Sequence, residues 1–205
     1  MKIFRYFLFA AVLLLAGALQ AQSPVRYNAE SGAGKIRIDG TSTVHDWTIE
    51  TAAVGGFMEL DPAFDADLKT LTTTPKAEII VPVRQLKSNP NHPNMDKVML
   101  EHLHATNSPV VKYSLLKLTP KAGAPSQFDA QGALTIAGVT RTNIMPITMQ
   151  RIDKTKIKVK GNTALKMTDY GVQPPAPRIL GIPTIKTGDE VKLTFEWTGA
   201  QPDGK

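Results

Sequence analysis

Strict alternation of apolar and charged residues is the feature that most constrains how this chain can fold. Residues 35–39 (KIRID) and 156–160 (KIKVK) alternate without a break, and residues 190–197 (EVKLTFEW) place an apolar residue at every second position. Because a β-strand points successive side chains to opposite faces, this period of two predicts strands with one buried face. We therefore expect the chain to fold mainly from half-buried strands.

The alternation also predicts which side chains point inward. Residues 76–83 (KAEIIVPV) add a further strand of this kind. The predicted inward-facing residues are Ile36, Ile38, Ile79, Val81, Leu134, Ile136, Ile157, Val159, Val191, Leu193, Phe195 and Trp197. Lys156, Lys158 and Lys160 should then face solvent, since a shift of one residue would exchange the two faces.

Residues 131–149 (QGALTIAGVTRTNIMPITM) predict a hairpin at the centre of the fold. Residues 133–136 and 143–149 are β-prone, and the connection expected at residues 138–141 contains a glycine that accepts positive φ at no steric cost. No residue in this segment is an obvious nucleophile, acid or metal ligand. We interpret it as the core hairpin of an all-β domain.

Helical spacing is convincing in only one segment, residues 94–104 (NMDKVMLEHLH). The residues that share one face of this helix at the spacing i, i+3, i+4, i+7 are Met95, Val98, Met99 and either His102 or Leu103. Asn94 is the expected N-cap. Residues 61–74 are expected to form a loop or a single helical turn. About eight antiparallel strands, one short helix and long loops predict either a barrel or two stacked sheets.

The first residues have the pattern of a secretory signal peptide. Lys2 and Arg5 precede an uncharged apolar run at residues 6–16, and small residues lead to a cleavage site after Ala21. The alternative, a membrane anchor, would need an apolar run of about 20 residues. We therefore expect export to the periplasm or the medium. The expected segments are a signal peptide (1–21), a lead-in (22–34), a barrel domain (35–199) and a tail (200–205).

Charge and cysteine content exclude several functions. Removing Lys2 and Arg5 lowers the formal net charge from +6 to +4, and the remaining basic residues are spread evenly, so nucleic-acid binding is not expected. The absence of cysteine excludes thiolate catalysis, disulfides, cysteine zinc sites and a lipid anchor on an N-terminal cysteine. We expect one soluble domain with a sizeable core and no stable membrane anchor.

The histidines do not predict a catalytic or metal site. His102 and His104 are two residues apart on a helix and point in different directions, so they cannot share a metal ion. His45 lies beside Asp46, but we expect it to bond to a neighbour while Trp47 joins the core. No nucleophile motif or phosphate loop is present. The expectation is a protein that is not an enzyme and needs no cofactor or metal.

The order of several motifs resembles the YceI family, exported bacterial proteins with a lipocalin-like fold that are associated with polyisoprenoid binding. The matching segments are residues 38–47, 83–103, 108–115, 132–141, 161–172 and 189–197. The most specific is 132–141 (GALTIAGVTR), which is similar to the family pattern G-x-L-T-I-x-G-V-T-[KR]. Residues 95–109 lack the Arg and the Phe pair that many members carry near the helix, which is typical of a divergent member.

The resemblance implies a lipocalin-like antiparallel barrel whose interior binds a long apolar chain, with the helix and long loops near one mouth. Burial of each CH₂ contributes about 0.8 kcal/mol, so such a ligand needs few polar contacts. The expected partner is thus an apolar lipid or isoprenoid. The residues expected to contact it are Ile36, Ile38, Trp47, Ile79, Val81, Met95, Val98, Met99, Leu103, Tyr113, Leu134, Ile136 and Phe195.

Two other functions fit the same sequence. A barrel packed with its own side chains would act through protein contacts, as an envelope or stress-response protein. An enzyme acting on a lipid head group at the barrel mouth would use His45. The mass of the purified protein would distinguish a packed barrel from a binding protein, because a bound lipid adds mass and a packed barrel carries none.

Overall fold

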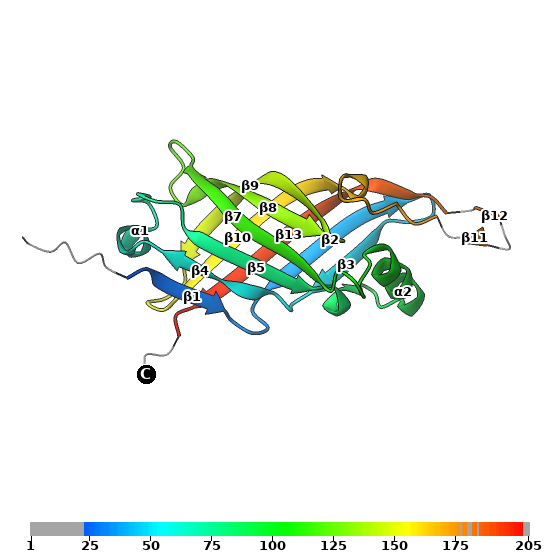
Figure 1. Ribbon diagram of the computed structural model, residues 1–205, viewed down its shortest axis with the longest axis horizontal. Helices are drawn as coiled ribbons and strands as arrows, with labels where there is room; N and C mark the ends of the chain where they lie inside the picture. The colour runs from blue at the N-terminus through cyan, green and yellow to red at the C-terminus, as the bar shows by residue number, and fades with distance from the viewer. Residues whose placement is uncertain (1–22, 177, 180–181, 184, 203–205) are drawn as a thin grey trace, which may run out of the picture.

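The computed structural model describes residues 23–176, 178–179, 182–183 and 185–202. Within them, eight antiparallel strands form a closed ring in which β1 pairs with both β4 and β13 (Figure 1). The ring strands are β1 (Val25–Ala29), β4 (Gly55–Leu60), β5 (Lys76–Pro82), β7 (Val110–Pro120), β8 (Gln127–Ile136), β9 (Val139–Arg151), β10 (Lys156–Lys166) and β13 (Thr187–Ala200). The predicted antiparallel barrel is confirmed, and the stacked-sheet alternative is excluded.

The other elements extend the wall of the barrel or lie at its ends. Three strands extend the sheet from β13: β2 (Lys35–Ser42), β3 (Trp47–Thr51) and β6 (Lys87–Ser88). The helical elements are α1 (Pro62–Asp67), η1 (Val83–Gln85), α2 (Pro93–His102) and η2 (Met167–Tyr170). A separate short hairpin consists of β11 (Arg178–Ile179) and β12 (Ile182–Pro183). Figure 1 shows α1 and α2 at opposite ends of the barrel.

The central hairpin forms as predicted, with a shorter connection. β8 and β9 pair from Gln127↔Thr148 to Ile136↔Val139. Only Ala137 and Gly138 join them, with φ of 49° and 84°. Two central residues with positive φ are typical of the tight turn that matches the twist of paired strands. The connection expected at residues 138–141 was therefore wrong, because Val139 to Arg141 already belong to β9.

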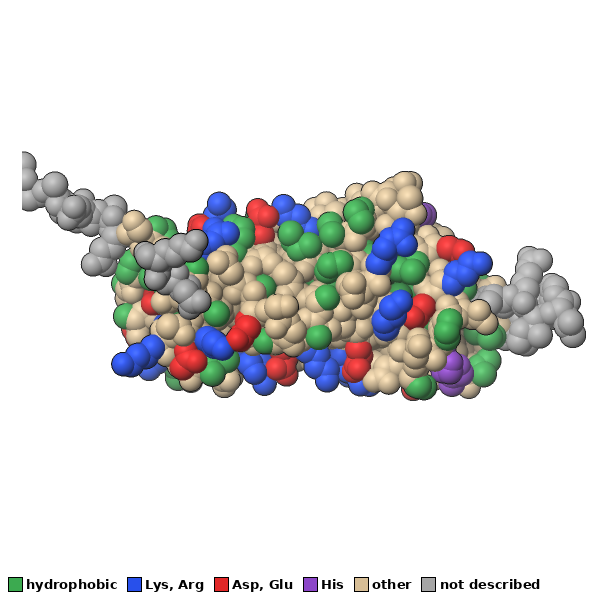
Figure 2. Space-filling model, turned by 90° about the horizontal axis from the view of Figure 1, so that it is seen from below, with side chains coloured by type: hydrophobic (Ala, Val, Ile, Leu, Met, Phe, Trp, Pro, Cys, Tyr) green, Lys and Arg blue, Asp and Glu red, His purple; other side chains and the backbone are tan. Residues whose placement is uncertain are grey.

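The predicted inward orientation of the apolar side chains is confirmed. Ile157 and Val159 are buried, whereas Lys156 pairs with Glu30 outside the barrel and Lys160 pairs with Glu196 at 3.5 Å. Figure 2 shows basic and acidic side chains interspersed over the face in view. The charged half of each alternating strand therefore points outward, as the pattern predicts.

Two boundaries differ from the sequence expectations. α2 begins at Pro93 with His92 as N-cap, not Asn94, because proline at the first helical position has its φ already set for a helix. β1 lies within residues 22–34, which we expected to be only a lead-in, and it closes the barrel. The expected signal peptide lies outside the described residues, as does the end of the tail.

One end of the barrel is closed by α1. Asp61 caps this helix by accepting a hydrogen bond from the Ala63 N–H. Phe64 then points into the barrel, where it is fully buried and packs edge-on against Phe128 with ring centroids 5.6 Å apart. The Tyr27 hydroxyl donates to Asp65 at 2.7 Å. The α1 end is consequently solid, and the space inside the barrel lies towards α2.

Candidate ligand-binding cavity

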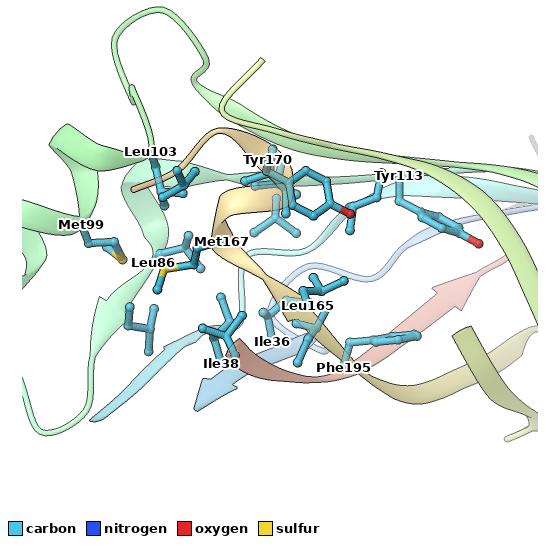
Figure 3. A pocket seen from close by; sticks show the side chains of 18 of the residues that line it. Ile36, Ile38, Leu86, Met99, Leu103, Tyr113, Leu165, Met167, Tyr170 and Phe195 are labelled. Carbon is cyan, nitrogen blue, oxygen red and sulfur yellow. The ribbon is translucent and has the colours of Figure 1, made fainter. Parts of the chain in front are cut away.

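The barrel encloses a cavity of about 500 Å³ whose lining is almost wholly apolar (Figure 3). Every residue that we expected to contact a ligand lines it. These residues come from β2 (Ile36, Ile38), β3 (Trp47), β5 (Ile79, Val81), α2 (Met95, Val98, Met99), the position after α2 (Leu103), β7 (Tyr113), β8 (Leu134, Ile136) and β13 (Phe195). Apolar pockets of this size are typical of sites for small apolar molecules.

Aromatic residues of the lining lie against glycines of neighbouring strands. A Cβ added to Gly132 would lie 2.2 Å from the Tyr113 ring, and one added to Gly161 would lie 2.5 Å from the Phe195 ring. Such distances are far below van der Waals contact. These glycines therefore let the rings lie flat against the wall and leave the cavity open.

Tyr113 brings a hydroxyl group into this apolar interior. Burial raises the pKa of Tyr113 to about 12, because the phenolate would lose its hydration there. The hydroxyl has a long hydrogen bond to the Ala130 carbonyl, at 3.4 Å. Tyr113 therefore stays neutral at physiological pH and contributes mainly apolar surface.

The η2 segment completes the wall between β9 and β10. These strands pair from Ile157↔Arg151 to Gly161↔Ile147, and η2 contacts both of them. Asn143 donates to the Tyr170 hydroxyl. Arg141, the last residue of the GALTIAGVTR motif, donates to the Asp169 carbonyl at 2.9 Å. The motif thus attaches η2 to the barrel.

Asp189 holds η2 from the side of β13. Its carboxylate accepts the Thr168 hydroxyl at 2.7 Å and the Thr168 N–H at 2.9 Å. These hydrogen bonds, the hydroxyl first, lower the pKa of Asp189. The segment that closes this part of the wall is therefore bonded to strands on both sides.

α2 covers part of the open end and is fixed to β6 by Asp96. Burial alone would raise the pKa of Asp96, but the bond from the Ser88 N–H at 2.8 Å and the Lys87 ammonium at 3.6 Å outweigh it and lower that pKa. A charged Asp96 therefore anchors the helix. Met99, which is 8% exposed, points from α2 into the cavity.

Among the described residues, the polar side chains at this mouth do not form a nucleophile–base pair. The Ser42 hydroxyl donates to the His45 carbonyl at 2.7 Å, so its proton is not directed at an imidazole. The His45 Nδ1 lies 2.8 Å from the Asp46 carbonyl and must donate, since a carbonyl only accepts. His102 contacts the Gln173 carbonyl in the same way. These contacts orient the two imidazoles at the rim.

The family model of the YceI-like domain matches residues 27–198. This chain belongs to the YceI family. No curated protein matches it.

Solved structures share the barrel at low identity. BcnA from Burkholderia cenocepacia matches with a TM-score of 0.64 and 15% identity over 83% of this chain and 98% of its own. A polyisoprenoid binding domain from Saccharophagus degradans matches with a TM-score of 0.62 and 14% identity over 87% and 99%. The Campylobacter jejuni YCEI protein gives 0.57 and 15% over 76% and 85%. These likenesses establish the fold.

The lining of this YceI barrel includes residues that sequence reasoning missed. They are methionines of β4 and β9 (Met58, Met145, Met149) and residues of β10, η2 and the segment after it (Leu165, Met167, Tyr170, Val172). The alternation of Met145, Ile147 and Met149 was the signal available for β9. No periodic pattern marks η2, whose place in the wall depends on contacts with distant strands.

Other site types are not found in the described part of this YceI chain. No three His, Asp or Glu residues described there lie where they could together hold a metal ion. Among the same residues, no helix has the length and apolar character needed to span a membrane.

Proposed function

We propose that this YceI-family barrel binds one apolar molecule, isoprenoid-like or otherwise lipidic, in its cavity and carries out no catalysis. The observation that carries the proposal is the apolar cavity of about 500 Å³. Each buried CH₂ of a ligand would contribute about 0.8 kcal/mol, so shape and apolar lining are sufficient for binding. The Saccharophagus degradans neighbour, described as a polyisoprenoid binding domain, supports a ligand of this class.

The cavity argues against a barrel that acts only through protein contacts, because packed interiors contain few voids larger than a water molecule. The rim geometry argues against an enzyme, because the Ser42 hydroxyl donates its proton to the backbone carbonyl of His45 and not to the His45 imidazole. Accordingly, any slow hydrolysis of a prenyl ester by the wild-type protein should be unchanged in His45→Ala. A lipid-ester turnover that disappears in this variant would contradict a pure binding role.

We also propose export with removal of residues 1–21, supported by Lys2, Arg5 and the apolar run that follows them. The intact mass of the protein recovered from its native compartment tests this proposal. A chain that begins at Gln22 is expected, and a full-length chain retained in the cytoplasm would contradict it.

A binding titration tests the ligand proposal. The chain's two tryptophans, Trp47 and Trp197, both line the cavity, so their fluorescence should report the uptake of geranylgeraniol. Ile79→Asp would place a charge in the lining and should abolish uptake. The matched control is Ile144→Asp, because Ile144 is 63% exposed on the outer face. Equal binding by the two variants, with circular dichroism showing both folded, would reject the cavity as the site.

A further inference from the structure

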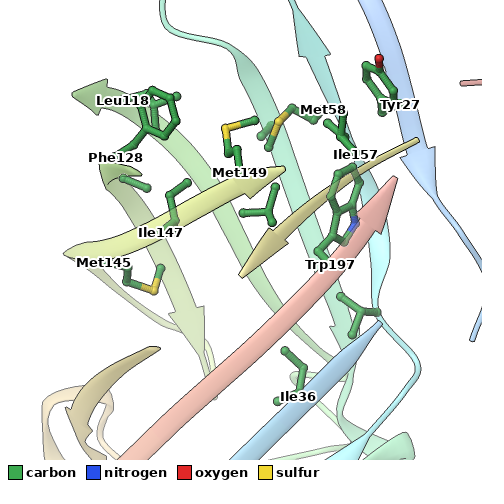
Figure 4. Close-up of a cluster of buried hydrophobic side chains, with 14 of the residues drawn as sticks. Tyr27, Ile36, Met58, Leu118, Phe128, Met145, Ile147, Met149, Ile157 and Trp197 are labelled. Carbon is green, nitrogen blue, oxygen red and sulfur yellow. The ribbon is translucent and has the colours of Figure 1, made fainter. Parts of the chain in front are cut away.

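The cavity ends at a floor on the side of α1. Met58 of β4, Met149 of β9 and Trp197 of β13 line its inner end from three sides. Figure 4 shows these side chains pointing into the barrel from different strands. All three are buried, with exposed fractions of 6%, 0% and 2%.

Behind this floor the barrel is filled by its own side chains. Phe64, Phe128 and Ile157 are at most 1% exposed, and none of the three lines the cavity. Arg151 joins the two residues that close this end, donating to the Tyr27 hydroxyl at 3.1 Å and to the Asp65 carboxylate at 2.9 Å. A ligand therefore cannot extend past the floor without displacing packed aromatic rings and a hydrogen-bonded network.

The volume above the floor limits the length of the ligand. A water-sized group occupies about 30 Å³, so 500 Å³ accommodates about 17 such groups, or between three and four five-carbon isoprene units. Carbons beyond that length would have to leave through the α2 mouth, whose lining includes Ser42, His45 and Lys166 beside the apolar side chains of α2, and there they would be only partly shielded from water.

We propose that Met58, Met149 and Trp197 form a chain-length stop, so that the cavity selects a single apolar chain of three to four isoprene units. This inference rests on the proposed function, and it adds the class of chain that the site prefers. The selection is physical: each carbon inside the cavity loses contact with water, whereas carbons outside the mouth do not. Affinity should consequently rise with chain length and then level off.

The test is a titration series with geraniol, farnesol, geranylgeraniol and geranylfarnesol, which contain two, three, four and five isoprene units. The dissociation constant is expected to fall about tenfold or more for each unit up to the fourth, and less than about threefold for the fifth. A fall that continues undiminished to the fifth unit would overturn the chain-length stop while leaving the binding function intact. No binding of any alcohol would overturn both.

Two variants should move the stop in opposite directions. The double variant Met58→Ala, Met149→Ala lacks six heavy atoms of the floor, slightly more than one isoprene unit. It should bind geranylfarnesol, which has the fifth unit, about tenfold more tightly than wild type does. Ala130→Leu fills the inner end of the cavity, where Ala130 is 3% exposed. In this variant the affinity should level off at three isoprene units. Thermal unfolding establishes whether each variant is folded. If the double variant is unfolded, the titrations of wild type and of Ala130→Leu still test the chain-length stop.

The matched control changes the mouth instead of the floor. Leu103 follows α2 at the open end, so Leu103→Ala should weaken all four alcohols by a similar factor and leave the levelling at four units. A shift of the levelling in Leu103→Ala, or unchanged levelling in a folded Ala130→Leu, would contradict a stop located at the floor.

Discussion

At the scale of single residues, the family motif has a structural explanation. Gly132 begins the segment GALTIAGVTR, and its missing side chain makes room for the Tyr113 ring. Arg141 ends the segment and bonds to Asp169. The sequence pattern identified both positions through a resemblance, but their roles depend on β7 and η2, which lie elsewhere in the chain. Pairwise contacts of this kind could not be predicted from local alternation.

Gly132→Ala should reduce both stability and ligand binding. The added Cβ would lie 2.2 Å from the Tyr113 ring, so the ring must move into the cavity or the strands must separate. Overpacking of this kind typically costs about 1–3 kcal/mol. Urea unfolding and the geranylgeraniol titration measure the two effects. Gly55→Ala is the control, because its Cβ would lie an ordinary 3.6 Å from the Ile80 carbonyl; equal effects of the two substitutions would contradict this role of Gly132.

Tyr113 should make the barrel sensitive to alkaline pH. Its pKa is raised to about 12 by burial, from a usual value of 10.0, so the fold favours the neutral phenol. Its contribution to stability is fully present below the pKa of the unfolded chain, and it is lost as pH rises from about 10 to about 12. Urea unfolding across this window should show a steeper loss for wild type than for Tyr113→Phe. The pKa values of Tyr27 and Tyr170 are also raised, but both tyrosines are present in wild type and in Tyr113→Phe, so the difference between the two proteins reports Tyr113.

Parallel losses of stability in the two proteins would contradict this role of Tyr113. Below about pH 10, Tyr113→Phe should be close to wild type, because the hydroxyl has only a 3.4 Å hydrogen bond to the Ala130 carbonyl.

At the scale of elements, the sequence predicted those with a complete period, gave α1 only as a loop or a single helical turn, and missed β1. β10 and β13 alternate over many residues, and α2 has apolar residues at helical spacing. α1 has only six residues, too few to show a period, and its signals are the Asp61 cap and Pro62. β1 has no clear alternation, and its pairing with both β4 and β13 defines it as part of the barrel.

α2 is expected to act in ligand binding and not only in stability. Met99→Asp places a charge at the cavity mouth and should reduce lipid binding at least about tenfold, while the strands keep the barrel folded. Lipid extraction and thermal unfolding on the same sample separate the two roles. A lower melting temperature with unchanged lipid content would reject the ligand role of α2. Lys97→Asp, on the exposed face of the same helix, is the control and should change neither quantity.

At the scale of the whole molecule, closure of the barrel joins the two ends of the described chain. Asn28 pairs with Ala200, and such a distant contact could not be predicted from patterns within single strands. Whether the interior is hollow is likewise a property of all the strands together, since it depends on how the volumes of their inward side chains add up. The sequence therefore predicted part of the lining, but the cavity and its floor emerged only from the assembled barrel.

Native mass spectrometry of the protein, purified gently and without detergent, tests whether the cavity holds one apolar molecule. The expected spectrum shows the mature chain with the additional mass of a single molecule, which organic extraction removes and which Ile79→Asp lacks. A spectrum with the protein mass alone, unchanged after incubation with geranylgeraniol, would contradict binding in the cavity.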